Sequence, residues 1–268
     1  MLEQKSFDFE GMNTAYWEGG SGQPLLLIHG SGPGASTLGN WRLVLDDLAK
    51  QFHVIAPDLI GFGKSARKPK APFFDLDLWS RQIAATLALF EEREVNVLGH
   101  SLSGYLALRL ASNNARVRKV MTTGAMGARF ALNKHLVSTW SFPATREAIV
   151  AAASSLVYDK SVITEAFIQG RVDVLHRDNY GSYFEEVFQG DKQQYIDAAV
   201  LTDNELSGVR CPTLLVHGRN DMPIPFEEAA LPLARALPHA DLYAVAKCGH
   251  SPALEHPALV VKLAGLFF

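Results

Sequence analysis

The chain has 268 residues, of which 25 are basic and 28 are acidic, and its formal net charge at pH 7 is −3. This near-neutral balance gives no basic footprint for nucleic acid, and a hydrophobic content of 48% excludes disorder as the main state. Two cysteines in the whole chain exclude a disulfide scaffold and favour a reducing compartment.

The start of the chain and its apolar stretches predict its location. An acidic residue, Glu3, stands in Met1–Lys5 where a secretory signal peptide needs basic residues, and no apolar run follows before Asp8. The longest apolar stretches, such as residues 258–268, fall short of the roughly 20 residues that span a bilayer. We therefore expect a cytoplasmic protein with no membrane segment.

Short apolar runs alternate with longer amphipathic segments along most of the chain. This pattern is typical of strand–helix–strand units that build a mostly parallel sheet. A hairpin around Gly11 precedes these units, so we expect the sheet to begin antiparallel. The predicted strands are 5–9, 13–17, 25–29, 53–57, 95–99, 117–122, 212–217 and 241–245, and the predicted helices are 40–50, 78–91, 102–112, 226–237 and 257–266.

Strand signals stop between residues 126 and 206, where a helical pattern takes over. A second independent domain is one interpretation, but about 80 residues bracketed by two halves of one sheet fit an insertion better. We expect a helical lid at 126–206, inserted in a core domain of 1–125 and 207–268. Its aromatic residues are expected to wall a substrate pocket, and they are Phe130, Trp140, Phe142, Phe167, Tyr180, Tyr183, Phe184, Phe188 and Tyr195.

One serine has the sequence context of a nucleophile. The motif GHSLS at residues 99–103 lies where a predicted strand ends and a predicted helix begins. A nucleophile elbow needs this context, because a strained turn lifts the hydroxyl above the sheet and demands small residues two positions away on each side. Gly99 and Ser103 meet that demand, although Ser103 stands where glycine is usual. We predict Ser101 as the nucleophile and disfavour an ordinary structural serine.

A serine hydroxyl is a weak nucleophile until a base removes its proton. Asp221 and His250 each follow a later predicted strand, which gives the chain order Ser, Asp, His that accompanies a serine elbow. Because the carboxyl ends of parallel strands meet at one edge of a sheet, we expect these side chains to lie close to Ser101. His250 would move the proton, and Asp221 would hold the imidazole in the required tautomer.

A glycine-rich loop follows the first predicted parallel strand, with the sequence HGSGPG at residues 29–34. Its glycines allow a sharp turn whose N–H groups face inward. We predict an oxyanion hole from the backbone N–H groups of Ser31 and Leu102. A phosphate-binding loop is excluded because the loop lacks the Gly-Lys-Ser/Thr ending, and residues 63–65 carry that tripeptide without the upstream glycine.

Other chemically active side chains receive structural interpretations. His100 directly follows a strand and His217 lies inside one, whereas a general base must reach Ser101 from a loop. Asp58 could be an alternative acid or a metal ligand, but an aspartate at this position more often caps a turn. No cluster has metal-ligand spacing, so we expect neither metal nor cofactor. Cys211 and Cys248 are expected to be far apart and free.

Together, the glycine-rich loop, the motif Pro57–Gly63, the serine elbow and the contexts of Asp221 and His250 resemble the α/β-hydrolase superfamily. The resemblance covers nearly the full chain. It implies the α/β-hydrolase fold, with a mostly parallel eight-stranded sheet, flanking helices and an inserted helical lid. It also implies a serine hydrolase, since the dehalogenase and epoxide-hydrolase branches carry an aspartate where Ser101 stands.

Within that superfamily, residues 29–35 followed by Asn40 and Trp41 resemble the meta-cleavage-product hydrolases. These enzymes split carbon–carbon bonds in ring-fission products of aromatic catabolism. Arg171 resembles their substrate-binding arginine, so the resemblance implies that Asn40 and Arg171 hold the 2-hydroxy-6-oxo-dienoate end of the substrate. A solvated arginine on a lid helix is the alternative. The family also implies a small acidic dienoate as the partner and a homo-oligomer.

Two positions depart from the family pattern. His100 stands before the nucleophile where asparagine is usual, and Ser251 stands after His250 where tryptophan is usual. Both positions are next to the substrate, so a carboxylesterase or lactonase with the same residues is the second hypothesis. A receptor that keeps the fold without activity is the third, and the intact set of catalytic residues disfavours it.

Overall fold

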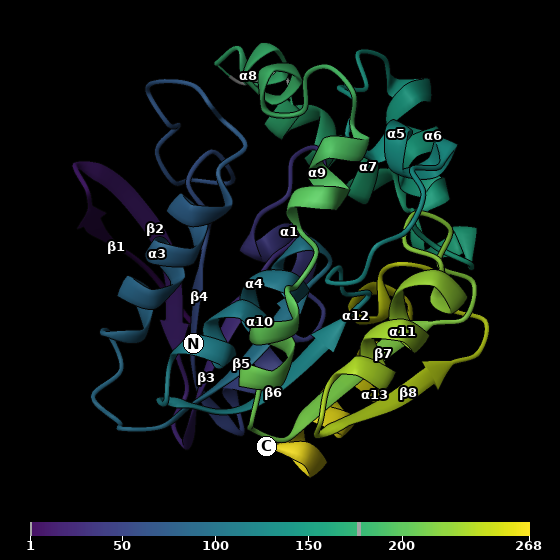
Figure 1. The fold of residues 1–268 in the computed structure, drawn as a ribbon. Coiled ribbons are helices and arrows are strands. Elements are labelled where there is room, and N and C mark those ends of the chain that lie inside the picture. Colours follow the sequence, from purple (N-terminus) through teal and green to yellow (C-terminus); the bar gives the residue numbers. More distant parts are fainter. Residues whose placement is uncertain (1, 176–177) are drawn as a thin grey trace.

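A computed structural model describes residues 2–175 and 178–268, so Met1 of the N-terminal segment and residues 176–177 of the predicted lid lie outside it. Across these residues, one sheet holds eight strands in the order β1-β2-β4-β3-β5-β6-β7-β8. Strand β2 runs antiparallel to β1 and β4, and all later neighbours are parallel (Figure 1). The strands are Glu3–Phe9, Met12–Gly19, Gln23–Ile28, Phe52–Pro57, Val95–His100, Val117–Thr123, Thr213–Gly218 and Ala240–Val245. The predicted fold class is confirmed.

The sheet has a hydrophobic cluster on each face. Along β3, Leu26 and Ile28 belong to one cluster, while Leu25 and Leu27 belong to the other. This alternation follows from the two-residue period of a strand, and all four side chains are fully buried because helices cover both faces. The first face is covered by helices α3, α4 and α11, which are Leu76–Leu87, Leu102–Asn113 and Leu231–Ala236.

The opposite face is covered by α1, α2, α12 and α13, which are Thr37–Trp41, Leu45–Ala49, Pro252–Glu255 and Pro257–Phe267. The prediction of one helix over 40–50 is wrong, because a turn closed by a hydrogen bond from Val44 N to Trp41 O separates α1 from α2. Both residues are buried in the same cluster as Leu45 and Leu48. The apolar spacing therefore continues through the turn, which is why periodicity could not reveal it.

The predicted helix 226–237 is also divided. Its first part, Phe226–Ala230, is a π-helical turn, and α11 follows with Pro232 near its start. Proline has no N–H to donate, so the regular helical pattern cannot run through this point. The short helix α12, directly after the loop that carries His250, is an addition that the sequence did not predict.

The segment between β6 and β7 is helical, as expected. It contains α5 Lys134–Thr139, α6 Arg146–Ser155, a 3₁₀ turn at Lys160–Val162, α7 Glu165–Leu175, α8 Tyr180–Val187, α9 Gln193–Ala198 and α10 Asp203–Gly208. Figure 1 places α5 to α9 above the sheet, on the side of the strands' carboxyl ends, while α10 lies beside α4. An ion pair between Arg109 and Glu205 at 3.2 Å joins α10 to α4.

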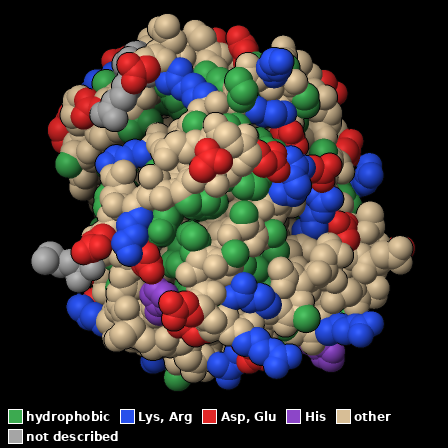
Figure 2. Space-filling model, turned by 90° about the vertical axis from the view of Figure 1, so that its left-hand side faces the viewer, with side chains coloured by type: hydrophobic (Ala, Val, Ile, Leu, Met, Phe, Trp, Pro, Cys, Tyr) green, Lys and Arg blue, Asp and Glu red, His purple; other side chains and the backbone are tan. Residues whose placement is uncertain are grey.

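One face of the molecule carries charges of both signs in mixture. Figure 2 shows Lys and Arg side chains interspersed with Asp and Glu on one face, and hydrophobic side chains gathered in a hollow near its middle. Among the described helices, none is long and apolar enough to cross a membrane.

Candidate active site

Ser101 occupies a strained turn at the carboxyl end of β5. Its backbone has φ +59° and ψ −125°, a region that side-chain-bearing residues rarely adopt. The turn brings the chain so close to itself that a Cβ on Gly99 would lie 2.2 Å from the carbonyl oxygen of Ser103. A small residue was predicted there, and the close approach restricts the position to glycine. Ser103 is buried and donates its hydroxyl hydrogen bond to the carbonyl oxygen of His29, so its side chain finds a partner inside the turn.

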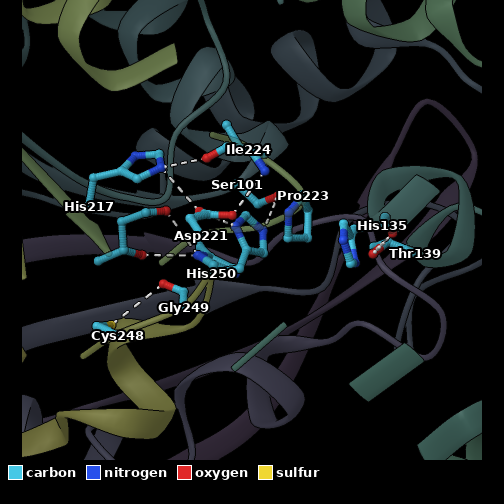
Figure 3. A network of polar contacts seen from close by, with 12 residues as sticks. Ser101, His135, Thr139, His217, Asp221, Pro223, Ile224, Cys248, Gly249 and His250 are labelled. Atoms are coloured by element: carbon cyan, nitrogen blue, oxygen red, sulfur yellow. Dashed lines mark hydrogen bonds and ion pairs between the residues drawn. The ribbon is translucent and has the colours of Figure 1, made fainter. Parts of the chain in front are cut away.

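The structure brings the three predicted side chains together. Ser101 Oγ lies 3.0 Å from His250 Nε2, and His250 Nδ1 lies 2.8 Å from Asp221 Oδ2. They follow β5, β8 and β7 respectively, so three strand ends converge on one point (Figure 3). The distances are within hydrogen-bond reach of a nucleophile, its base and an orienting acid.

Asp221 is a buried carboxylate with several donors around it. Its Oδ1 accepts a hydrogen bond from Ile224 N at 2.9 Å, and its Oδ2 faces His250 and also His217, whose Nε2 is 3.1 Å away. Burial alone would raise the pKa of Asp221, but the charge on His250 and the hydrogen bonds from His217 and His250 hold it below its usual range. The group is therefore an anion that can stabilise an imidazolium.

His217 plays a larger part than its sequence position suggests. Its Nε2 lies 2.8 Å from Ile224 O as well as close to Asp221 Oδ2, so one N–H is shared between the carbonyl and the carboxylate (Figure 3). This agrees with a structural rather than a basic role, but the partnership with Asp221 was not predicted. The four-residue spacing between positions 217 and 221 was a signal of proximity, but the two side chains meet only because the chain turns after β7.

His100 is held as a neutral ring against His250. Its Nδ1 donates to Thr123 O at 2.9 Å, and the two imidazole rings have centroids 4.8 Å apart. Burial first, and the nearby charge of His250 second, lower the pKa of His100 to about 3. Because Nδ1 carries the proton, Nε2 is left as a hydrogen-bond acceptor beside the cavity that His100 helps to line.

The glycine-rich loop is pinned by His29. The His29 ring donates from Nδ1 to Gly30 O at 2.6 Å and accepts at Nε2 from Leu59 N at 2.9 Å. Within the described part of the chain, the backbone N–H groups of Ser31 and Leu102 donate to no other protein group. Ser31 lines the same cavity as Ser101. Leu102 directly follows Ser101 and is the first residue of helix α4.

Asp58 lies within the turn that follows β4. Its two carboxylate oxygens accept hydrogen bonds from Thr37 N at 2.7 Å and Lys64 N at 2.8 Å. It therefore ties backbone segments together, as the turn interpretation expects. Cys211 and Cys248 are both free. Among the described residues, no group of three or more His, Cys, Asp or Glu side chains is placed to hold a metal ion.

A cavity extends from Ser101 and His250 towards the helices of the β6–β7 segment, and Asn40 and Arg171 both line it. Asn40 Oδ1 accepts from Gly30 N at 3.3 Å. Arg171, on α7, donates to the carbonyl oxygen of Pro33 and stacks on Phe167, with its guanidinium carbon 5.3 Å from the ring centre. Burial and the charge of Arg42 lower its pKa to about 10, so it remains a cation. Arg171 is therefore not a freely solvated side chain, which was the alternative interpretation.

The expectation of an aromatic wall is mostly wrong. Of the nine predicted aromatic residues, Trp140 and Phe167 line the cavity. Others pack away from it: Phe188 stacks on Trp140 with ring centres 5.0 Å apart and meets Phe184 and Tyr195 at 5.3 Å. They belong to the hydrophobic cluster on the first face of the sheet. The cavity wall there is mainly aliphatic and consists of Leu136, Ile149, Ala152, Ala153, Leu156, Val157 and Leu175.

Comparison with known proteins gives a consistent result. The model of the alpha/beta hydrolase family matches residues 25–263. The 2-hydroxymuconate semialdehyde hydrolase of Pseudomonas sp. (strain CF600) is 31% identical over 96% of this chain and 90% of its own length. The 2-hydroxy-6-oxo-2,4-heptadienoate hydrolase of Pseudomonas putida is 30% identical over 96% of this chain and 93% of its own.

Solved structures agree with these sequence relatives. The meta-cleavage product hydrolase CumD from Pseudomonas fluorescens IP01 superposes with a TM-score of 0.93 at 30% identity, covering 98% of this chain and 97% of that chain. A 2-hydroxy-6-oxo-6-phenylhexa-2,4-dienoate hydrolase from Rhodococcus superposes with a TM-score of 0.89 at 26% identity, covering 99% of both. The resemblance predicted from the sequence motifs is confirmed.

Proposed function

This chain belongs to the alpha/beta hydrolase family, and we propose that it hydrolyses a carbon–carbon bond in a 2-hydroxy-6-oxo-dienoate from aromatic catabolism. The observation that carries the proposal is the hydrogen-bonded array of Ser101, His250 and Asp221 at one end of a cavity that holds an arginine further along. Such an array suits acyl transfer, and an arginine suits a carboxylate. The names of the similar hydrolases support the same substrate class.

Ser101 and His250 perform the bond-making step in this proposal. His250 takes the Ser101 proton as Oγ attacks the C6 carbonyl of the ketonised substrate, and Asp221 stabilises the imidazolium that forms. The carbon–carbon bond beside C6 then breaks, its electron pair leaves with the dienolate fragment, and His250 returns the proton. Water attacks the remaining acyl group and restores Ser101. Water is the only cosubstrate.

Backbone and cationic groups stabilise the charges that develop. We assign the oxyanion hole to the N–H groups of Ser31 and Leu102, which have no competing protein acceptor among the described residues. The loss of one such donor typically costs about 3 kcal/mol of transition-state stabilisation. Asn40 and Arg171 hold the carboxylate end, where the positive charge of Arg171 favours the dienolate that departs.

The aliphatic wall receives the other end of the substrate. Side chains from α5 and α6, among them Leu136, Ile149 and Ala153, line the cavity. They offer apolar contact but no buried charge, which suits an alkyl or aryl tail better than a second carboxylate. We propose that residues 126–206 act as the lid that builds this compartment on a core of 1–125 and 207–268.

We also propose a cytoplasmic location and assembly into a homo-oligomer. Free cysteines at positions 211 and 248 support a reducing, cytoplasmic location. A homo-oligomer follows from the family resemblance. Sedimentation of the purified protein would test the oligomer, and a monomer at micromolar concentration would contradict it.

A carboxylesterase or lactonase is the second candidate, and His100 is the observation that favours it. The buried His100 ring presents an acceptor beside the cavity where the family pattern has an amide. The deciding measurement compares kcat/KM on dienoate ring-fission products with methyl, phenyl and carboxyethyl tails against kcat/KM on short p-nitrophenyl esters. An excess of orders of magnitude for the esters would overturn the carbon–carbon assignment. A fluorophosphonate probe that fails to label Ser101 would instead favour a receptor.

A further inference from the structure

A second hollow adjoins the cavity on its outer side. The two share Gly39, Phe167, Arg171 and Leu254, so they meet at the point where Arg171 lies. Exposed leucines at positions 38 and 43 give this outer groove an apolar floor, with exposed fractions of 40% and 46%. Three further cations line it: Arg42, Lys64 and Arg67.

Arg42 and Arg171 share one aromatic ring at this junction. The guanidinium carbon of Arg42 lies 5.1 Å from the centre of the Phe167 ring, and that of Arg171 lies 5.3 Å from the same centre. Neither guanidinium forms an ion pair with a carboxylate of the described residues. Arg109, in contrast, pairs with both Asp77 and Glu205.

Two like charges held this close without a counter-ion are unfavourable for each other. Burial, followed by the charge of Arg42, lowers the pKa of Arg171, which is the direction expected for cations that repel. An anion bound beside both would relieve that repulsion. The two carboxylates that line the groove, Asp58 and Asp178, do not supply it, since Asp58 already binds Thr37 N and Lys64 N and no ion pair joins either to Arg42.

A buried donor in the groove provides independent support. Tyr180 lines the groove, and its buried hydroxyl has no acceptor for its hydrogen among the described residues, because the nearby Gly34 N–H is itself a donor. A buried phenol that cannot donate its hydrogen is costly, so a ligand that accepts this hydrogen bond would be stabilised there. Burial raises the pKa of Tyr180, which keeps the hydroxyl protonated as a donor.

We propose that Arg42, with Tyr180, forms an outer capture site for the carboxylate of an unsaturated, apolar acid, from which the acid passes to Arg171 in the cavity. This proposal rests on the proposed function for the identity of the acid, but the binding site itself does not. The apolar floor at Leu38 and Leu43 would contact the hydrocarbon chain while the carboxylate binds the cations. Capture near the entrance raises the encounter rate of an anionic substrate, and that effect weakens with salt.

The test uses sorbate, a dienoate without the 6-oxo group, and its neutral amide sorbamide. Neither offers the bond that the proposed reaction breaks, so both report binding alone. Their dissociation constants are measured by quenching of the intrinsic tryptophan fluorescence of the full-length protein at low and high salt. The variants are Arg42→Gln, Arg42→Lys and Tyr180→Phe. Arg118→Gln is the matched control. This substitution also removes one positive charge, but at the start of β6, where Arg118 donates a hydrogen bond to Gln23.

The capture site predicts a charge-specific result. Arg42→Gln should weaken sorbate binding about fivefold, Tyr180→Phe by a smaller factor, and Arg42→Lys should retain most of the affinity. Sorbamide binding should change less than twofold in all variants, and Arg118→Gln should leave both ligands unaffected. Equal losses for sorbate and sorbamide would show that Arg42 only packs on Phe167, and unchanged sorbate binding in Arg42→Gln would overturn the proposal directly.

The same variants separate this proposal from the proposed function. If the wild type fails to cleave dienoates yet binds sorbate more tightly than sorbamide through Arg42, the capture site stands and the carbon–carbon activity falls. If dienoates are cleaved and kcat/KM in Arg42→Gln keeps the wild-type value and salt dependence, the activity stands and the capture site falls. The expected result is a fall of about fivefold in kcat/KM with a flatter salt dependence.

Discussion

The two halves of the site are built in different ways. The sheet half consists of strand ends that carry Ser101, Asp221 and His250, and hydrogen bonds of 2.8 to 3.0 Å link these side chains to one another and to Ile224 N. The helical half consists of side chains packed on each other, such as Trp140 on Phe188, with Arg171 joined to the core through one carbonyl oxygen. In the proposed reaction, the sheet therefore holds the residues that make and break bonds, while substrate recognition rests on side-chain packing in the helical segment.

The His250 loop belongs partly to both halves. His250 N donates to Leu156 O at 2.8 Å, which anchors the loop to the end of α6. Glu255 strengthens this connection: Oε1 accepts from Gly249 N at 2.7 Å, while Oε2 accepts from Tyr158 N at 2.7 Å and Asp159 N at 3.0 Å. One carboxylate thus bridges the base's loop and the helical segment.

The largest expected effect comes from the sheet half. Ser101→Ala should lower kcat by several orders of magnitude on dienoates and esters alike, since it removes the attacking oxygen. Stopped-flow turnover measures the loss, and an unchanged unfolding midpoint serves as the control. Turnover close to the wild-type value would remove the nucleophile assignment.

Recognition by the helical half predicts a substrate-selective loss. Arg171→Gln should reduce kcat/KM on an acidic dienoate about a hundredfold and on a neutral p-nitrophenyl ester only a few-fold, because the ester carries no carboxylate. Arg129→Gln is the matched control, since Arg129 lies in the same segment and pairs with Asp197 on the surface. An equal loss on both substrates would mean that Arg171 only supports the segment.

The buried His100 ring predicts a pH dependence of stability in the sheet half. Its folded pKa of about 3 lies below the unfolded value of 6.5, so below pH 6.5 the unfolded chain gains a proton that the folded chain does not. At pH 7 and above, His100 therefore does not change the free energy of unfolding. As the pH drops from 6.5 towards 3, the free energy of unfolding falls by about 1.4 kcal/mol per pH unit because of His100. Urea unfolding at pH 7 and pH 5 measures the change.

Between pH 7 and pH 5, the free energy of unfolding of His100→Asn should fall by about 2 kcal/mol less than that of the wild type. Other titrating groups, such as the buried His29, remain in both proteins and cancel in the comparison. A parallel decline of the two proteins would contradict the neutral state assigned to His100.

The smallest effect is expected at the bridge between the halves. Glu255→Gln places an amide NH₂ against backbone N–H donors, so one side of the bridge must be lost. We expect a fall of about tenfold in kcat on both substrates with KM little changed, because the base is misplaced and the carboxylate site is not. Glu228→Gln, at an exposed position, is the control. A rise in KM with kcat unchanged would instead place the effect of the substitution in the helical half.

Local patterns were sufficient for the sheet and for the positions of Ser101, Asp221 and His250. Strand ends can be found from short apolar runs, and a glycine two residues before the serine marks the turn that only glycine permits. The same patterns failed at residues 40–50, where apolar spacing continues across a turn. They also failed in the helical segment, because an aromatic side chain that lines a cavity has the same sequence signature as one that fills a core.

The sequence by itself determined the fold class, the succession of strands and helices along the chain and the residues available for nucleophilic chemistry, because these depend on the periods and turns of neighbouring residues. Only the tertiary structure decided which distant groups meet. The Glu255 carboxylate meets the Tyr158 N–H, and the guanidinium of Arg42 lies on the Phe167 ring that Arg171 also contacts, although Glu255 and Tyr158, like Arg42 and Phe167, are far apart in the chain. Such contacts depend on how helices pack over the sheet, and no local pattern encodes that packing.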